Sequence, residues 1–310
     1  MLGIYEMKLN IKNYYYKLFN NTKYQKIKQQ NIIKESVEIF EKKYKSYLYE
    51  IGSKIKNNSK ISFLHSGHLG DLIYSLPVVN ELAKNHICHF YIQTNKKITT
   101  EYYKHPSGNV FIDDKTLNLF LPLMKEQKSI HKVEKYIGQE IDINLDIFRD
   151  LPVNILFNSP RWYFHITGVQ VDLSEPYLNV LPHEKIKNKI VIHRTFRRRC
   201  QFINYKFLNN YENLIFTGLK DEYDDLKKEI KNLEFYDCKD FLDMARVIKA
   251  CKFFIGNMSA AYALAEAMKV PRLLEAEPPF PVVQPVGKNA FDFYYQPHFE
   301  KWCKYLNESR

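Results

Sequence analysis

Mostly apolar runs of four or five residues alternate with amphipathic stretches along much of the chain. The first two runs, 61–64 and 88–92, are bounded by polar residues and predict buried strands. Between them, apolar side chains recur every three or four positions from Leu72 to Ala83, which predicts a helix. Strand, helix and strand together form a βαβ unit, and such a unit implies a parallel sheet.

The same alternation starts again after residue 188. Helical patterns at 221–231, 241–250 and 259–268 separate predicted strands at 189–193, 214–218, 234–236, 252–256 and 271–274. Two such series predict two α/β domains, which we place at 61–182 and 183–288 because Pro182 and a polar stretch interrupt the pattern. A final helix within 289–310 is expected to pack back toward the first domain.

Residues 1–60 contain no proline and predict a helical extension. Ile33, Val37, Phe40 and Tyr44 follow one another at spacings of three and four, which gives one apolar stripe. The extension holds 13 Lys against 5 Glu, so it carries most of the formal net charge of +11. A basic helix can lie on an anionic membrane surface or contact nucleic acid, or it can simply present a solvated face. We expect no specific nucleic-acid ligand.

The five cysteines are scattered and form no CxxC pair, which argues against a disulfide framework and a zinc site. No run approaches the roughly 20 apolar residues that span a bilayer. The Lys-rich start also lacks the apolar centre of a secretion signal. These features favour a cytoplasmic protein, with peripheral contact to the inner membrane face through the basic extension as an open alternative.

The first predicted strand runs into a glycine-bearing turn that contains Gly67, His68, Gly70 and Asp71. In open α/β sheets, ligands bind outside the carboxyl ends of the strands, and glycine lets a ligand approach the backbone. Asp71 has two interpretations that the sequence leaves open. It can cap the following helix by accepting backbone N–H bonds, or it can be a general base that removes a proton from a hydroxyl.

A second glycine-bearing turn, Gly256-Asn257-Met258-Ser259-Ala260, follows an apolar strand and opens a helix. Exposed N–H groups at a helix start bind anions, and small side chains let phosphate oxygens approach. We therefore predict a phosphate site at Gly256, Asn257, Ser259 and Ala260. The alternative is that Asn257 or Ser259 only caps the helix.

A loop with four arginines, His193–Arg199, follows the first strand of the second domain. Arginine forks can bind diphosphate oxygens, and Arg194, Thr195 and Arg197 are our candidates. A solvated basic loop or an RNA contact is the alternative.

Gly218 and Glu222 follow the next strand, where Glu222 can accept hydrogen bonds from a ribose or can be an ordinary residue of a first helical turn. The ten histidines show no HExxH spacing, and no carboxylate cluster has the form of a metal site. We expect no protein-bound metal.

Two segments resemble motifs of the bacterial heptosyltransferase-like glycosyltransferases, family 9. The turn Gly67–Asp71, with the helix and Leu76-Pro77 after it, resembles the amino-terminal G-x-x-G-D turn of that family. The segment Phe241–Pro271, with Gly256-Asn257-Met258-Ser259 at its centre, resembles the carboxyl-terminal donor motif. The matching order of elements covers about residues 61–275.

The resemblance implies an α/β protein with two Rossmann-like domains facing a cleft, which is the GT-B fold. It also implies inverting transfer of a sugar from a nucleotide-sugar donor to a cell-surface glycan or lipid-linked acceptor, with no cofactor and no essential metal. Asp71 would be the base, with Gly67, His68 and Gly70 on the acceptor side. Arg194, Arg197 and the helix start at Ser259 would hold the donor diphosphate.

The sequence departs from the family at several positions. The family usually has an acidic residue or Ser where Met258 stands, Gly where Ala260 stands, and His where Ala263 stands. Its usual Lys in the phosphate loop is replaced by arginines. These departures leave the donor sugar open, heptose above all. Two alternatives remain, namely a GT-B shell that binds nucleotide or glycan without turnover, and a sugar-nucleotide epimerase or hydrolase.

Overall fold

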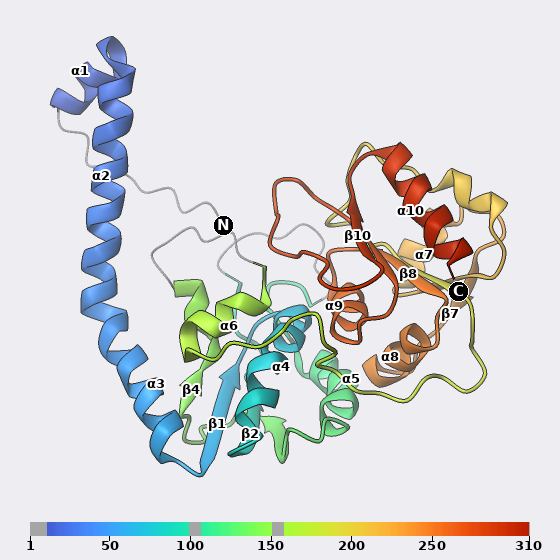
Figure 1. The fold of residues 1–310 in the computed structure, drawn as a ribbon, viewed down its shortest axis with the longest axis horizontal. Coiled ribbons are helices and arrows are strands. Elements are labelled where there is room, and N and C mark those ends of the chain that lie inside the picture. The colour runs from blue at the N-terminus through green and yellow to red at the C-terminus, as the bar shows by residue number, and fades with distance from the viewer. Residues whose placement is uncertain (1–10, 99–106, 151–157, 310) are drawn as a thin grey trace.

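The computed structural model describes residues 11–98, 107–150 and 158–309, which form two α/β domains and a helical arm (Figure 1). The first domain contains a four-stranded parallel sheet in the order β3-β2-β1-β4. Its strands are β1 (Lys60–His65), β2 (Ile87–Ile92), β3 (Lys132–Lys135) and β4 (Ile143–Asn144). Its helices are α4 (Leu69–Leu82), α5 (Asp114–Lys125), the 3-10 helix η2 (Leu145–Asp150) and α6 (Pro160–Thr167).

The second domain contains a six-stranded parallel sheet in the order β10-β9-β8-β5-β6-β7. Its strands are β5 (Ile190–His193), β6 (Leu214–Thr217), β7 (Glu234–Tyr236), β8 (Phe253–Asn257), β9 (Arg272–Glu275) and β10 (Ala290–Phe293). Its helices are the 3-10 helix η3 (Lys206–Asn210), α7 (Lys220–Leu226), α8 (Phe241–Lys249), α9 (Ala260–Ala267) and α10 (Gln296–Glu308). The strand order reverses between β5 and β8, and in the first sheet between β1 and β4. A doubly wound sheet opens its ligand crevice at such a reversal.

The mostly apolar runs of the second half form the centre of this sheet. β5, β6, β8 and β9 are buried along their whole length. Parallel strands are covered on both faces, so they need no polar alternation. The two-domain α/β prediction is confirmed, whereas α5, β3, β4 and α6 of the first domain were missed.

One apolar cluster spans both domains, and a second cluster lies within the second domain alone. Helix α4 packs against α9, and α5 packs against α8 (Figure 1). Buried residues of all four helices belong to a single cluster, which includes Leu72, Leu123, Val247 and Leu264. The interface between the domains is therefore an apolar contact between helices rather than an open gap.

The C-terminal segment 289–310 packs on the second domain, so the prediction that it returns to the first domain is wrong. Its first residues form the edge strand β10 instead of a helix, and α10 covers this edge. Phe293 stacks on Phe299 with 3.9 Å between ring centroids, and Phe291 stacks on Trp302 at 4.0 Å. These aromatic contacts tie α10 to its own sheet.

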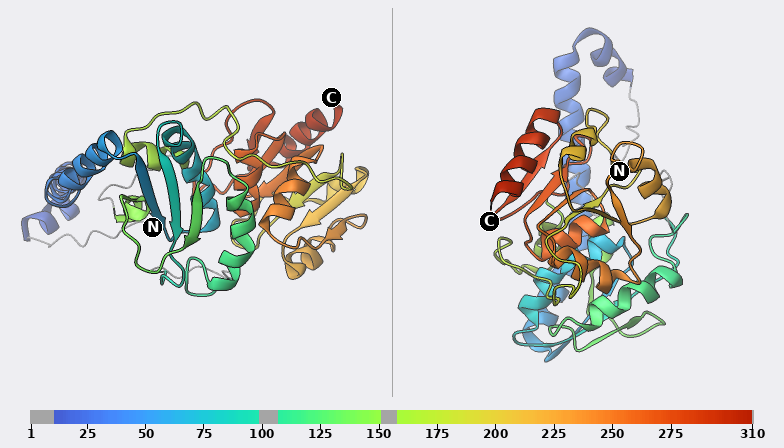
Figure 2. Two further views of the ribbon diagram at one scale, coloured as in Figure 1. Left: turned by 90° about the horizontal axis from the view of Figure 1, so that it is seen from below. Right: turned by 90° about the vertical axis from the view of Figure 1, so that its right-hand side faces the viewer.

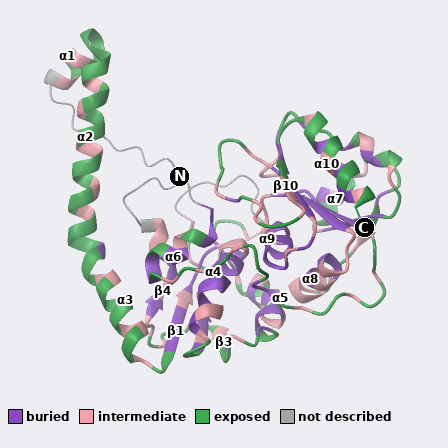
Figure 3. Ribbon diagram, viewed as in Figure 1, coloured by how far each residue is buried: buried purple, intermediate pink, exposed green. Residues whose placement is uncertain are grey.

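The helical arm precedes β1 and confirms the predicted extension over the described residues 11–57. It consists of α1 (Ile11–Phe19), α2 (Asn21–Ile39), the π-helical η1 (Phe40–Tyr44) and α3 (Lys45–Asn57). α3 packs on the first domain, whereas α1 and α2 project away from both domains, as Figure 2 also shows. Figure 3 shows the exposure of this outer half in green. None of the described helices is both long enough and apolar enough to cross a membrane.

Candidate functional site

Asp71 lies in the first turn of α4, just beyond the carboxyl end of β1. Its side chain is 27% exposed and accepts a hydrogen bond from Arg149 Nη2 at 2.6 Å. The N-cap of α4 is His68, and no side chain caps this helix. The interpretation of Asp71 as a capping residue is therefore wrong, since its carboxylate lies beside a cation instead.

Arg149 belongs to an ion network that the sequence analysis missed. Its Nη1 donates to Asp146, which follows β4 and is buried. Asp146 also accepts hydrogen bonds from Ser66 N at 2.9 Å and Lys96 Nζ at 3.3 Å. Burial opposes ionisation of Asp146, but the His65 ring and the Arg149 guanidinium outweigh burial and hold the pKa of this carboxyl well below its usual range. Asp146 is therefore a permanent negative charge behind Arg149.

Tyr163 of α6 holds the backbone of the same turn. Its hydroxyl donates to the carbonyl oxygen of Asp71 at 2.9 Å and lies 2.8 Å from His65 Nε2. Burial raises the pKa of Tyr163 well above its ordinary value, so the hydroxyl keeps its proton. A Cβ on Gly67 would lie 1.9 Å from Arg149 Nη2. The guanidinium therefore fills the space that the sequence analysis left for a ligand at Gly67.

At the second sheet, one buried amide ties two loops together. Asn257 Oδ1 accepts a hydrogen bond from Thr195 N at 2.9 Å, and Asn257 Nδ2 donates to the carbonyl oxygen of Thr195 at 2.8 Å. Asn257 is fully buried, so it positions Thr195 rather than facing a ligand itself. A Cβ on Gly256 would lie 2.8 Å from the carbonyl oxygen of His193, so this glycine serves the close approach of β5 and β8.

Ser259 caps α9 by accepting a hydrogen bond from Tyr262 N at 3.2 Å, which confirms the capping alternative for this residue. Met258, Ser259 and Ala260 are all partly exposed. The start of α9 is thus open to solvent, and an open helix start with small side chains retains the properties of an anion site.

The arginine loop is not solvated, so that interpretation is wrong. Arg194 is only 4% exposed, and its Nε and Nη2 reach the Glu275 carboxylate at 2.7 and 2.8 Å. Its guanidinium also lies 4.4 Å from the ring centroid of Tyr205. Arg199 pairs with Asp225. The bidentate bond to Glu275 occupies the fork of Arg194, so the predicted diphosphate contact of this residue is corrected to a structural role.

Glu222 lies in the first turn of α7 and is buried. It accepts a hydrogen bond from Phe196 N at 3.3 Å, and burial raises its pKa to about 7. Gly218 has a φ of +146°, and a Cβ there would lie 2.9 Å from His193 Nδ1. Both residues support the arginine loop and its strand, and the ribose contact of Glu222 stays a prediction.

The glycine-bearing turns of the two domains meet. A Cβ on Gly70 would lie 3.9 Å from the carbonyl oxygen of Ser259 and 3.8 Å from Cβ of Ala263. Asp71 is the next residue along the chain. The turn that carries the candidate base and the start of α9 therefore meet at one contact between the domains.

His68 lies in a cluster of arginines from both domains at this contact. Burial lowers its pKa to about 3, and Arg197, Arg149 and Arg198 lower it further in that order. Its ring meets Phe111 edge-on, with 5.0 Å between centroids. Arginines of both domains thus lie near one neutral imidazole, although Arg149 and Arg198 are themselves paired with carboxylates.

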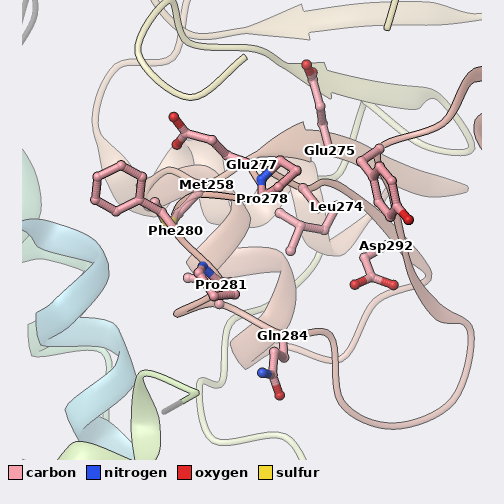
Figure 4. A pocket seen from close by; sticks show the side chains of 12 residues that line it. Met258, Leu274, Glu275, Glu277, Pro278, Phe280, Pro281, Gln284 and Asp292 are labelled. Carbon is pink, nitrogen blue, oxygen red and sulfur yellow. The ribbon is translucent and has the colours of Figure 1, made fainter. Parts of the chain in front are cut away.

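A pocket of about 510 Å³ opens beside the start of α9, outside the carboxyl ends of β8, β9 and β10 (Figure 4). Met258 and Phe280 contribute apolar walls, while Glu277, Gln284 and Asp292 contribute polar groups. This pocket could not be predicted from the sequence, because the loop that closes it has no helical or strand pattern.

The same loop is tied to the first domain. Ser159 N and Oγ both donate to the carbonyl oxygen of Val282, at 2.8 and 2.7 Å. Arg198 also pairs with Glu277 of this loop at 3.1 Å. The pocket therefore borders the contact between the domains.

Within the described ranges, no three His, Cys, Asp or Glu side chains come together as a metal site requires. The expected absence of a metal and of a cofactor stays a prediction.

No protein-family model matches the sequence, and no curated protein shows significant sequence similarity to it. The structure does align with solved ones. The E. coli heptosyltransferase WaaC with ADP gives a TM-score of 0.56 at 9% identity, over 80% of this chain and 99% of that chain. The same enzyme with ADP-2-deoxy-2-fluoro heptose gives a TM-score of 0.52 at 10% identity, over the same shares of the two chains.

The family 9 glycosyltransferase of Veillonella parvula gives a TM-score of 0.50 at 12% identity, over 81% of this chain and 90% of that chain. The unmatched share of this chain is comparable in length to the residues before β1. The chain therefore has the GT-B fold, in the form found in the family 9 glycosyltransferases.

Proposed function

We propose that the chain is an inverting glycosyltransferase, which moves a sugar from a nucleotide-sugar donor to a hydroxyl of a glycan or lipid-linked acceptor without an essential metal. The observation that carries the proposal is the meeting of the two glycine-bearing turns, with Asp71 on one side and the start of α9 on the other. Inverting displacement needs a base near the acceptor and positive charge near the leaving group. The GT-B fold that the chain shares with the ADP-bound E. coli heptosyltransferase WaaC supports a nucleotide-sugar donor.

In the proposed reaction, Asp71 takes the proton of the acceptor hydroxyl while that oxygen attacks the anomeric carbon of the sugar. The bond from this carbon to the diphosphate oxygen breaks, and the nucleoside diphosphate leaves with the bonding electrons. Arg197 and the N–H groups at the start of α9 stabilise the charge that develops on it. His68 stays neutral in this cluster, so it adds no charge of its own.

We place the donor sugar in the pocket beside Met258, because this residue lines the pocket and also belongs to the turn before α9. Glu277, Gln284 and Asp292 can accept hydrogen bonds from sugar hydroxyls. The pocket's volume of about 510 Å³ lies within the usual range for small-molecule sites, roughly 300–1,000 Å³.

The variant Asp71→Asn tests the proposal. A thermal-shift screen that starts with ADP and its sugar conjugates identifies the nucleotide, since a ligand at about 100 times its Kd stabilises by about 2.7 kcal/mol. We expect Asp71→Asn to lose at least about 100-fold in turnover while its nucleotide affinity stays near wild type. Asp224→Asn, which changes an exposed carboxylate on α7, is the matched control and should keep both. Wild-type turnover in Asp71→Asn would remove this residue from the mechanism.

One observation favours a second function, namely that the Asp71 carboxylate is already paired with Arg149 and so is less available as a base. In this alternative, the GT-B shell binds a nucleotide or glycan without turning it over, and the departures at Met258 and Ala263 fit the same view. Tight nucleotide binding with no product from any donor and acceptor supports this alternative, whereas product formation excludes it. Donor incubated without acceptor separates a hydrolase or epimerase, because a transferase is nearly silent under these conditions.

A further inference from the structure

The outer part of the helical arm lies apart from the two domains. We call residues 13–34 the arm tip, which comprises most of α1 and the first part of α2. α1 folds back on α2, and the pair projects clear of the body of the molecule (Figures 1 and 2). No residue of α2 is buried, whereas Ile51 of α3 is 1% exposed against the first domain. The inner part of the arm is thus anchored and its tip is presented to solvent.

The arm tip exposes large apolar side chains on α1. The side chains of Tyr14, Tyr15, Leu18 and Phe19 are 55%, 58%, 64% and 73% exposed. Apolar side chains that cluster at one end of a molecule mark a surface that a partner covers. Aromatic residues of this kind are favoured where water meets lipid headgroups.

The arm tip is also purely cationic. It contains no Asp or Glu, and its five lysines are all exposed: Lys17, Lys23, Lys26, Lys28 and Lys34. A lysine near an anionic leaflet strengthens binding by about 1 kcal/mol, which is roughly a fivefold factor in the partition constant. Charge complementarity therefore points to an anionic partner.

The chemistry of the arm tip favours a lipid surface over a second copy of the chain or a nucleic acid. A second copy would bring five lysines against five lysines, and like charges oppose that contact. Nucleic acid would satisfy the lysines but would leave the aliphatic Leu18 and the flanking Phe19 uncovered on a helix without arginines. A headgroup layer covers apolar side chains and neutralises lysines at the same time.

We propose that the arm tip lies on a membrane surface that contains anionic lipids, with the apolar side chains of α1 in the headgroup region and the lysines at the lipid phosphates. The helices from Asn21 to Asn57 comprise 37 residues, or about 55 Å at 1.5 Å per residue. The arm therefore acts as a tether that keeps the two domains within about 55 Å of the membrane surface. This proposal does not rest on the proposed sugar transfer.

Flotation of the full chain with lipid vesicles tests the proposal. Vesicles of phosphatidylcholine are compared with vesicles of phosphatidylcholine mixed with the anionic phosphatidylglycerol, each at low and high salt. We expect binding to the anionic vesicles alone, and we expect this binding to weaken as salt rises.

Charge variants separate the arm tip from the rest of the surface. Lys17→Glu/Lys23→Glu/Lys28→Glu should lose at least about 100-fold in the partition constant, from the roughly fivefold contribution of each lysine. The matched control Lys128→Glu/Lys185→Glu/Lys187→Glu makes the same charge change outside the arm and should bind like wild type.

The double variant Leu18→Ser/Phe19→Ser keeps every charge and should bind the anionic vesicles at least about tenfold more weakly. Thermal melting confirms that each variant is folded. The proposal is overturned if the full chain ignores anionic vesicles, or if the arm-tip variants bind as well as wild type. It is equally overturned if the same variants abolish self-association or nucleic-acid binding but leave flotation unchanged.

Discussion

Arg149 bridges two carboxylates, donating from Nη2 to Asp71 at 2.6 Å and from Nη1 to the buried Asp146. Its guanidinium also lies 4.3 Å from the ring centroid of Phe148. Because Asp146 stays ionised behind it, Arg149 is held from one side and offers its other edge to Asp71. The candidate base is thus oriented by a cation whose own position depends on Asp146, two residues after β4.

Arg149→Gln should lower turnover of the identified donor at least about tenfold and leave nucleotide affinity near wild type. The reason is that Asp71 loses the group that orients it, while the second domain is unchanged. Steady-state kinetics and a nucleotide-binding titration measure the two quantities. Arg161→Gln, which changes an exposed arginine on α6, is the control. Equal losses of nucleotide affinity and turnover would place Arg149 in donor binding instead.

Gly67→Ala should reproduce the defect of Arg149→Gln, because the new Cβ would lie 1.9 Å from Arg149 Nη2 and would displace the guanidinium from Asp71. Such overpacking typically costs about 1–3 kcal/mol in the free energy of unfolding. Gly52→Ala is the control, since no heavy atom lies within 4 Å of its new Cβ and it should stabilise α3 by about 0.5–1 kcal/mol. Chemical denaturation and turnover are the measurements, and wild-type turnover in Gly67→Ala would contradict the steric argument.

Arg194→Met and Arg197→Met should fail in different ways. Arg194→Met leaves the buried Glu275 without its partner and should cost about 3–5 kcal/mol of stability. Arg197 is partly exposed, so Arg197→Met should cost less stability than Arg194→Met, and it should weaken nucleotide binding by about 1.5–3 kcal/mol, the value of a charge-assisted hydrogen bond. Glu275→Gln added to Arg194→Met should recover part of the lost stability. Opposite assignments of the two phenotypes would restore Arg194 as the diphosphate ligand.

Glu222→Gln should change how stability depends on pH. Burial raises the pKa of Glu222 to about 7 in the folded protein, from an ordinary value of 4.5. Between these values the folded state keeps a proton that the unfolded state has released, so wild-type stability falls as pH rises from about 4.5 to 7. The variant lacks this fall and should be more stable than wild type at about pH 8, by up to about 3 kcal/mol. Denaturation curves at several pH values test this, and parallel curves for both proteins would show that Glu222 ionises normally.

The second domain could be predicted from the sequence because its central strands are short, apolar and buried on both faces. The end of the first domain could not be predicted in this way. β3 has the sequence KVEK, and β4 has two residues, so neither forms an apolar run. The alternation of apolar and polar residues at 141–147 was the one signal of β4. The alternation of Phe291 and Phe293 likewise indicated an edge strand where a helix was expected.

The site was predictable only as far as local motifs carry information. The turns at Asp71 and Ser259 were found because each follows a strand and opens a helix. The sequence could not show which arginine would lie near the contact between the domains. Arg194 is paired with Glu275, a residue that lies 81 positions further along the chain. Arg149 and its network were missed for the same reason, since only the fold brings the residues after β4 beside α4.

The packing of α4 on α9 and of α5 on α8 makes the two domains one folding unit. If the chain were cut between the two sheets, each half would expose a pair of apolar helices to water. Each half would also lose the hydrophobic contacts that hold its glycine-bearing turn in place. Heating should therefore melt both sheets in one cooperative transition. Any opening that admits a large acceptor must then come from the loops around the contact between the domains, while α4, α5, α8 and α9 stay packed together.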